Sequence, residues 1–298
     1  MDVAVKENTV ISEAPPRVSE GKRFVRVFLR RPIVIMGCCI LLLLFFCAAF
    51  PGLIAPYEPT KQDLRSVLLE PSSQHLLGTD ALGRDMFSRV IYGARTAVIV
   101  GFSALFISAI IGAVLGLAAG YFGGITYTII MRFIDALMAF PALLLALTIA
   151  ALLGGGMQMV IIALGVGMMP GYARVMCGQA MSIKENDYVL ASHSLGASSA
   201  RVMFRHIFPN AMPPMIVMMT IMVGTTILAE AGLSYLGIGI KDPVVAWGSL
   251  VNDGYKYLLT RPFLSIAPGV AIILVVYAFN MVGDGLRDAI DPRLRGTL

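Results

Sequence analysis

Charged side chains are scarce in this sequence. Of its 298 residues, 14% are charged and 57% are hydrophobic, and the mean hydropathy is +0.81. A soluble globular domain usually carries about 25% charged residues. A chain this apolar cannot bury its hydrophobic side chains in one water-facing core. The composition therefore predicts an all-α integral membrane protein whose helices lie in a lipid bilayer.

Motifs for catalysis, nucleotide binding and metal binding are also missing. The sequence contains no GxSxG, no HExxH and no GxxxxGK[ST] phosphate-binding loop. We therefore expect no catalytic residues, and any energy for uphill work must come from a partner. The four cysteines and three histidines lack the spacing of metal ligands. We expect free thiols, no metal site and no cofactor bound by this chain.

Long apolar runs are present instead. A membrane-spanning helix needs about 20 such residues. Six segments qualify: Ile33–Ile54, Ala94–Tyr121, Ile129–Leu153, Met157–Met176, Met212–Leu233 and Phe263–Val282. The first run is too long for the apolar region of a signal peptide and lacks a small-residue cleavage site, so we interpret it as a retained span.

The basic residues predict how the spans are oriented. The net charge of +5 comes from Lys and Arg in short clusters between apolar runs, which is typical of membrane topology rather than of nucleic-acid binding. No acidic residue lies between Gly21 and Arg31, so we expect a cytoplasmic amino terminus. Six spans then return the carboxyl terminus to the same side, and the segment after the fourth span is also expected to be cytoplasmic.

Small residues and prolines interrupt the spans. Gly112, Gly116 and Gly120 recur at four-residue spacing, which leaves one helix face bare for close packing against another helix. Their spacing can also be incidental in a chain with 30 glycines. Pro141 and Pro170 are expected to kink the third and fourth spans, and a kinked helix can line a cavity.

A few ionisable residues fall within or near the spans, where charge is a functional candidate by default. Glu230 is expected near the outer end of the fifth span. It can face a translocation pathway or pin the end of the helix, and we favour the structural role. Arg132 and Asp135 are three residues apart and are expected to pair with each other. Arg174 is expected to reach lipid phosphates. Outside, Trp247–Leu259 is expected to form an amphipathic helix that packs on membrane or protein.

The segment after the fourth span predicts a helix, a tight turn and a second helix. Asn186 or Asp187 can cap the first helix, and Gly196 can supply the left-handed residue that ends it. Ser198 can cap a second helix that continues to about Phe208. The first helix carries small residues, so it can enter a groove on another protein. An ordinary helical loop between spans is the alternative.

The same segment carries a resemblance to a known family. Leu190, Ala191 and Ser192, with Gly196 after three further residues and Pro209 thirteen positions later, resemble the EAA loop of binding-protein-dependent ABC importer permeases. Leu190 replaces the usual acid and Ser192 the second alanine. In that family the loop forms a coupling helix seated in a cleft of the ATPase subunit. The resemblance implies that the coupling residues are Tyr188, Leu190, Ala191, Ser192, Leu195, Gly196 and Ala197.

The resemblance covers most of the chain. Residues 76–95, 120–124, 233–237, 246–248 and 279–292 resemble segments of DppC/OppC-type permeases and occur in the family's order. This implies a type I ABC importer permease fold with both termini cytoplasmic. The implied divisions are a cytoplasmic arm (1–32), a first span with an extracytoplasmic segment (33–93), a five-helix core (94–284) containing the coupling loop (183–208), and a cytoplasmic tail (285–298).

The family implies a function in uptake. This chain would form half of a translocation pathway for dipeptides or oligopeptides in the cytoplasmic (inner) membrane of a bacterium or archaeon, with Glu230, Pro141 and Pro170 as pathway candidates. Its implied partners are membrane lipid, a homologous second permease, an extracytoplasmic solute-binding protein and two ATPase subunits that hold ATP and Mg²⁺; no nucleic acid is implied.

Alternatives to this function differ in cargo or in class. Within the same role, the cargo can be a nickel chelate or an oligosaccharide. From another class, an ion-driven secondary transporter would show repeated halves and broken helices with polar residues near the midplane. The sequence displays neither feature, so we favour the ATP-driven importer.

Overall fold

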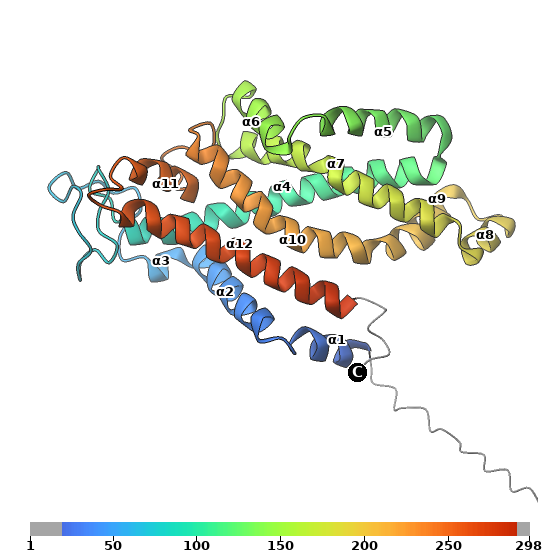
Figure 1. Cartoon of the computed structure of the whole chain (residues 1–298), viewed down its shortest axis with the longest axis horizontal. Coiled ribbons are helices and arrows are strands. Elements are labelled where there is room, and N and C mark those ends of the chain that lie inside the picture. The colour runs from blue at the N-terminus through green and yellow to red at the C-terminus, as the bar shows by residue number, and fades with distance from the viewer. Residues whose placement is uncertain (1–19, 291–298) are drawn as a thin grey trace, which may run out of the picture.

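The computed structural model of the chain describes residues 20–290, and every regular element in that range is a helix (Figure 1). Residues 1–19 of the predicted cytoplasmic arm and residues 291–298 of the predicted tail lie outside the described residues. The elements are α1 (Glu20–Phe28), α2 (Pro32–Ala49), α3 (Pro51–Ile54), α4 (Met86–Phe122), α5 (Gly124–Met138), α6 (Ala142–Leu152), α7 (Met157–Lys184), α8 (Asp187–Ser194), α9 (Ser199–Val202), the π-helical stretch η1 (Met203–Ile207), α10 (Phe208–Tyr235), α11 (Trp247–Tyr255) and α12 (Phe263–Ile290).

Five helical segments are long and apolar enough to cross a membrane. They are α2, α4, α7, the run from α9 through α10, and α12. The bent pair α5 and α6 provides a sixth span when it is counted as one. The prediction of an all-α membrane protein with about six spans is therefore confirmed. The first span is shorter than predicted because α2 ends at Ala49, just before Pro51 begins the short helix α3.

The third span is broken rather than kinked. The sequence predicts a span over Ile129–Leu153 with a kink at Pro141, and the change of direction is larger than a kink, because α5 and α6 are separate helices that meet at 86°. Pro141 is the cause, because it lacks a backbone N–H and disfavours helical geometry at the residue before it. Its own backbone is extended, with φ −54° and ψ 129°. No broken helix was predicted from the sequence, and that absence was used as an argument against a secondary transporter. The break at Pro141 is a feature that sequence reasoning failed to find.

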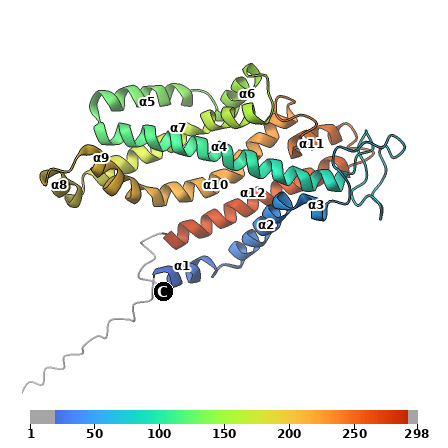
Figure 2. The ribbon, with the colours of Figure 1, turned by 180° about the vertical axis from the view of Figure 1, so that it is seen from behind.

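The longest helix, α4, packs along α7, and the two ribbons lie side by side in both views (Figures 1 and 2). Gly112, Gly116 and Gly120 lie at this contact. A Cβ atom at any of the three would lie within 3.0 Å of atoms of α7, including backbone atoms. The two backbones therefore approach more closely than any larger side chain would permit.

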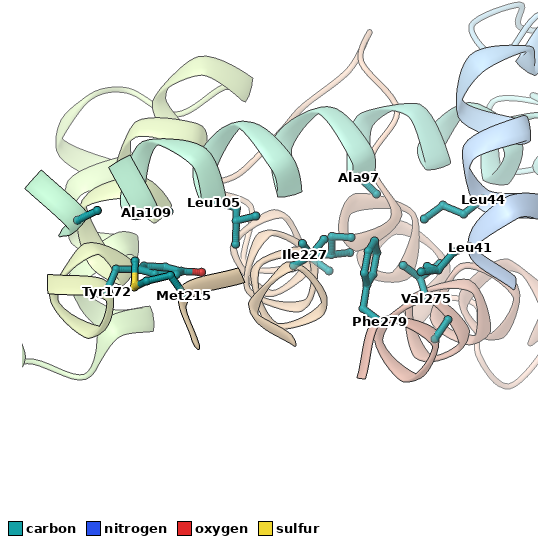
Figure 3. Close-up of a cluster of buried hydrophobic side chains, with 14 of the residues drawn as sticks. Leu41, Leu44, Ala97, Leu105, Ala109, Tyr172, Met215, Ile227, Val275 and Phe279 are labelled. Carbon is teal, nitrogen blue, oxygen red and sulfur yellow. The ribbon is translucent and has the colours of Figure 1, made fainter. Parts of the chain in front are cut away.

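An apolar core joins the spans along their length. Leu41 and Leu44 of α2 meet Val275 and Phe279 of α12 at one part of it, and Tyr172 of α7 meets α10 farther along (Figure 3). Small and large side chains interdigitate here, as they do in well-packed interiors. This core holds the spans together as one bundle, and the bundle has two ends.

The two ends of the bundle have different constructions. At one end α8 projects beyond the neighbouring spans (Figure 1); we call this the α8 end. At the other, residues 55–85 and 236–262 form loops around α11; we call this the loop end. Trp247 and Leu250 of α11 are buried within the protein, and the Trp247 Nε1 donates to the Val90 carbonyl oxygen at 2.8 Å. The amphipathic helix is shorter than predicted, and its apolar face packs on the chain itself.

Candidate functional site

The short helix α8 has a well-defined end. It begins after Asn186, whose backbone is extended, and it ends in a left-handed glycine, Gly196, with φ +82°. The Gly196 N–H donates to the His193 carbonyl oxygen, and the Ala197 N–H donates to that of Ser192. This pair of hydrogen bonds is the Schellman motif, which satisfies the last free carbonyl groups of a helix. The predicted helix and its glycine stop are both present.

One side of α8 is attached to the rest of the chain. Val189 is fully buried. The Tyr121 hydroxyl of α4 lies 2.9 Å from the His193 Nε2, and the Ser192 Oγ lies 3.4 Å from the His206 Nε2 of η1. The Lys184 Nζ donates to the Tyr121 carbonyl oxygen at 2.8 Å, which joins the end of α7 to the end of α4. The first two of these hydrogen bonds hold α8 against α4 and η1.

The other side of α8 is open to solvent. Leu195 is 87% exposed, Leu190 is 50% exposed and Tyr188 is 48% exposed. Ala191 and Gly196 are also exposed, whereas Ser192 and Ala197 are half-buried. Of the seven coupling residues that the resemblance implies, five therefore lie on the open face of α8 and two lie on the attached side. Sequence reasoning missed the contact of His193 with Tyr121, because the two residues are far apart in the chain and nothing local links them.

The helix that follows α8 does not stop where the sequence predicts. Ser198 caps it as expected, accepting a hydrogen bond from the Arg201 N–H. The predicted end near Phe208 is wrong, because the helix runs from Ser199 to Tyr235 through the π-helical stretch η1. Pro209 lies directly after η1, where the backbone hydrogen bonds already depart from the α-helical pattern, since the Phe208 N–H donates to the Met203 carbonyl oxygen. The Asn210 side-chain amide donates to the His206 carbonyl oxygen at 2.6 Å, which satisfies an acceptor beside the proline.

Two charged groups of the spans pair differently from the prediction. The predicted pair of Arg132 with Asp135 is wrong, because Asp135 of α5 accepts from Arg174 of α7 at 2.6 Å. Arg174 is therefore held by a carboxylate of its own chain rather than by a lipid phosphate. Asp135 pairs with an arginine of another helix rather than with the arginine on its own helix. Local spacing could not predict this pair, because it does not reveal that α5 and α7 lie side by side.

The other predicted pathway candidates have separate positions. Glu230 is 1% exposed, and its Oε1 accepts from the Ser234 hydroxyl at 2.7 Å. Pro170 lies inside α7, which remains helical around it, and Pro141 lies at the break between α5 and α6. Each lies on or beside a different helix, and α6 begins next to the part of α7 that contains Pro170, since a Cβ atom at Gly167 would lie 3.1 Å from the Ala142 carbonyl oxygen. Among residues 20–290, no three His, Cys, Asp or Glu side chains are placed to hold a metal ion.

A buried network of charges occupies the loop end. Asp80 accepts from the Arg84 Nε and from the Arg89 Nη1, each at 2.6 Å. The same two guanidinium groups donate to Asp242, at 2.9 Å and 3.1 Å. We call these four residues the arginine–aspartate network. It joins the segment before α4 to the segment between α10 and α11, and sequence reasoning missed it. Its one local signal is the four-residue spacing of Asp80 and Arg84.

The network shifts the titration of its members. Burial alone would lower the pKa of Arg84, but the hydrogen bonds to Asp242 and Asp80 raise it above its usual value. Burial alone would raise the pKa of Asp242, but hydrogen bonding to Arg84 and the charges of Arg89 and Arg84 hold it below its usual value. Both shifts favour the charged forms. The four charges therefore neutralise one another within the chain, while the buried Arg89 Nε has no hydrogen-bond partner among the described residues.

Comparison with protein families gives a match over most of the chain. Residues 112–296 match the family described as binding-protein-dependent transport system inner membrane component. Residues 19–71 match the N-terminal TM domain of oligopeptide transport permease C.

Several curated proteins are similar along nearly their full length. The glutathione transport system permease protein GsiD of Pectobacterium atrosepticum is 38% identical over 275 residues, which cover 92% of this chain and 91% of that protein. A putative peptide transport system permease protein of Brucella suis is 41% identical over 270 residues, covering 91% of each chain. The dipeptide transport system permease protein DppC of Alkalihalophilus pseudofirmus is 36% identical over 278 residues, covering 93% and 91%.

A solved structure shares the fold. A chain of the MetNI methionine ABC transporter in inward-facing conformations superposes with a TM-score of 0.56 at 21% identity, covering 69% of this chain and 98% of that one. The resemblance of this sequence to DppC/OppC-type permeases is confirmed by these matches. The chain therefore belongs to the inner membrane components of binding-protein-dependent transport systems, as a permease of the peptide-transport type.

Proposed function

We propose that this chain forms half of the translocation pathway of an ATP-driven peptide importer and that α8 couples it to an ATPase. The relatives that support this cargo are named for peptides, a dipeptide and glutathione. In the same proposal a homologous permease supplies the other half, two ATPases bind the paired α8 helices, and a solute-binding protein delivers the peptide from outside.

The open face of α8 is the observation that carries the coupling role. This helix projects at the end of the bundle (Figure 1), and its exposed side chains include Tyr188, Leu190 and Leu195. Exposed apolar patches outside the bilayer mark sites of protein interaction. A cytoplasmic position for α8 agrees with the basic clusters and puts the α8 end inside and the loop end outside. The divisions at residues 32, 93 and 284 remain part of this proposal.

The connections of α8 suit it to transmit force. On one side it follows α7, a helix of 28 residues. On the other it leads, through a turn of only a few residues, into the helix Ser199–Tyr235. A partner that displaces α8 therefore moves two long helices at once. The π-helical stretch η1 has poorer backbone geometry than an α-helix, so it is the place where the second of these helices can bend.

The alternative cargoes and the alternative class of transporter have less support. Nickel chelates and oligosaccharides fit the same permease role, but the three relatives named above point to peptides and glutathione. A broken span is present in α5 and α6, so the absence of broken helices no longer argues against a secondary transporter. Membership of the binding-protein-dependent family argues against it instead.

Replacing Gly196 tests the coupling role. The Gly196→Val variant forces a branched residue into a left-handed backbone conformation, so the end of α8 must rearrange. We expect peptide uptake in cells carrying the complete transporter to fall at least about tenfold, with the complex still present in the membrane.

A matched control separates coupling from general strain. Gly154 is also left-handed, with φ +88°, and open space surrounds it at the end of α6. The Gly154→Val variant applies similar backbone strain far from α8 and is expected to keep most of the uptake. Normal uptake in the Gly196→Val variant would contradict the proposal.

A further inference from the structure

The ion pair between Asp135 and Arg174 lies at an unusual depth. Lys184 and Tyr121 are hydrogen-bonded and mark the same level at the α8 end. Arg174 is ten residues before Lys184, about 15 Å along α7, and Asp135 is eleven residues past Gly124, about 16 Å along α5. The hydrocarbon core of a bilayer is about 30 Å thick. Arg174 lies two residues before the expected inner end of the span Met157–Met176, and Asp135 lies six residues past the expected inner end of the span Ile129–Leu153. The ion pair therefore lies within the spans, in the inner half of the membrane.

The pair is not enclosed by its own chain. The Arg174 side chain is 50% exposed and that of Asp135 is 44% exposed. Charged side chains in hydrocarbon are costly, and in membrane proteins they face protein or a water-filled cavity. Lipid is therefore the wrong neighbour for this surface, and either the second permease or an aqueous path must cover it.

One face of α5 continues this polar surface. Thr128, Arg132 and Asp135 recur at intervals of four and three residues, which places them along one side of the helix, and all three are exposed. Phe133 points to another side and is 54% exposed. Arg132 has no ion-pair partner within residues 20–290. The cluster of Arg132, Asp135 and Arg174 thus carries two guanidinium groups and one carboxylate, a net charge of +1.

An excess guanidinium in a low-dielectric setting selects for an anion. Arginine binds carboxylates through two parallel N–H donors, and Asp135 holds Arg174 in place while leaving half of its surface open. A peptide carries a carboxylate at its carboxyl terminus, and its amino terminus is attracted to an acid such as Asp135. The cluster therefore presents complementary charges to both ends of a short peptide.

We propose that Arg132, Asp135 and Arg174 form a substrate-binding station in the inner half of the membrane, in the translocation pathway, where Arg132 and Arg174 bind the peptide carboxylate. The proposal rests on the peptide-importer function above and adds the site that the cargo meets inside the membrane. A second role for the Asp135–Arg174 pair is to hold α5 on α7, because only Met131 and Ile134 of α5 are buried. The experiments are chosen to separate binding from this structural role.

The first experiment asks whether water reaches the cluster. In a transporter whose four native cysteines are replaced by serine, the Arg132→Cys and Phe133→Cys variants lie at the same depth on different sides of α5. We expect a membrane-impermeant thiol reagent to label the Arg132→Cys variant at least about tenfold faster, because water reaches position 132 and lipid covers Phe133. Equal rates, or no labelling of the Arg132→Cys variant, would overturn the site.

The second experiment asks whether the positive charge serves the cargo. A defined di- and tripeptide library first identifies a peptide that cells with the complete wild-type transporter import. The Arg132→Gln variant is expected to lower uptake of that peptide at least about tenfold, the Arg132→Lys variant is expected to keep most of it, and both should leave the amount of assembled complex unchanged.

The outcomes distinguish this site from the function on which it rests. Normal uptake in the Arg132→Gln variant, or equal loss in the Gln and Lys variants, would overturn the binding station and leave the importer intact. A wild-type transporter that imports none of the library would contradict the peptide-importer function itself, and the station would fall with it.

Discussion

The two ends of this permease differ in the side chains that define them. At the loop end, four charged side chains neutralise one another, and Asp80, Arg84 and Arg89 are less than 10% exposed. At the α8 end, apolar side chains are left uncovered, and Leu195 is 87% exposed. A charge that is satisfied within the chain needs no partner, whereas an exposed apolar face outside the bilayer does. The comparison teaches that charge pairing within the chain joins the segments of the loop end, whereas the apolar face of α8 is left for a partner to cover.

The largest expected effect comes from opening the loop end. The Asp80→Asn variant keeps the shape of the side chain but removes the charge that pairs with Arg84 and Arg89. We expect the free energy of unfolding to fall by about 3 kcal/mol, because two buried guanidinium groups lose a shared partner. Thermal unfolding of the purified complex in detergent measures the loss.

An exposed ion pair of the same region provides the control. Glu70 pairs with Arg261 at 3.1 Å, and the Glu70 side chain is 74% exposed. The Glu70→Gln variant is expected to cost less than about 1 kcal/mol, since exposed ion pairs contribute little. Equal losses in the Asp80→Asn and Glu70→Gln variants would mean that the arginine–aspartate network is not a special feature of the loop end.

A smaller effect is expected from acid. The pKa of Asp242 is held below its ordinary value of about 3.9, so its contribution to stability is complete above that pH and disappears as the pH falls through the lowered pKa. We expect the loop end to be unaffected between about pH 7 and pH 5 and to loosen below about pH 4.

The single tryptophan of the chain reports this change. Trp247 lies at the loop end and is buried, so its fluorescence shifts when the loops separate. Acid loosening that is the same in the Asp242→Asn variant, which has no carboxylate to titrate at this position, would show that another group is responsible.

The sequence was informative where the signal is local. Apolar length predicted the spans, and Gly196 predicted the end of α8, because both depend on residues close together in the chain. It failed where the partner is distant. Two arginines join Asp80 to Asp242, which is more than 150 residues away from them in the sequence. Asp135 pairs with Arg174 on another helix. Pro209 was taken for a stop, although the helix continues through it directly after the π-helical stretch η1.

The account depends most on what covers the open face of α8. A photo-reactive benzoylphenylalanine can replace either Leu195 or Leu259, two leucines of similar exposure at opposite ends, 87% and 99%. In membranes carrying the complete transporter, we predict that light joins the probe at position 195 to an ATPase subunit and that the probe at position 259 forms no such adduct. An absence of ATPase adducts from position 195 would contradict the account.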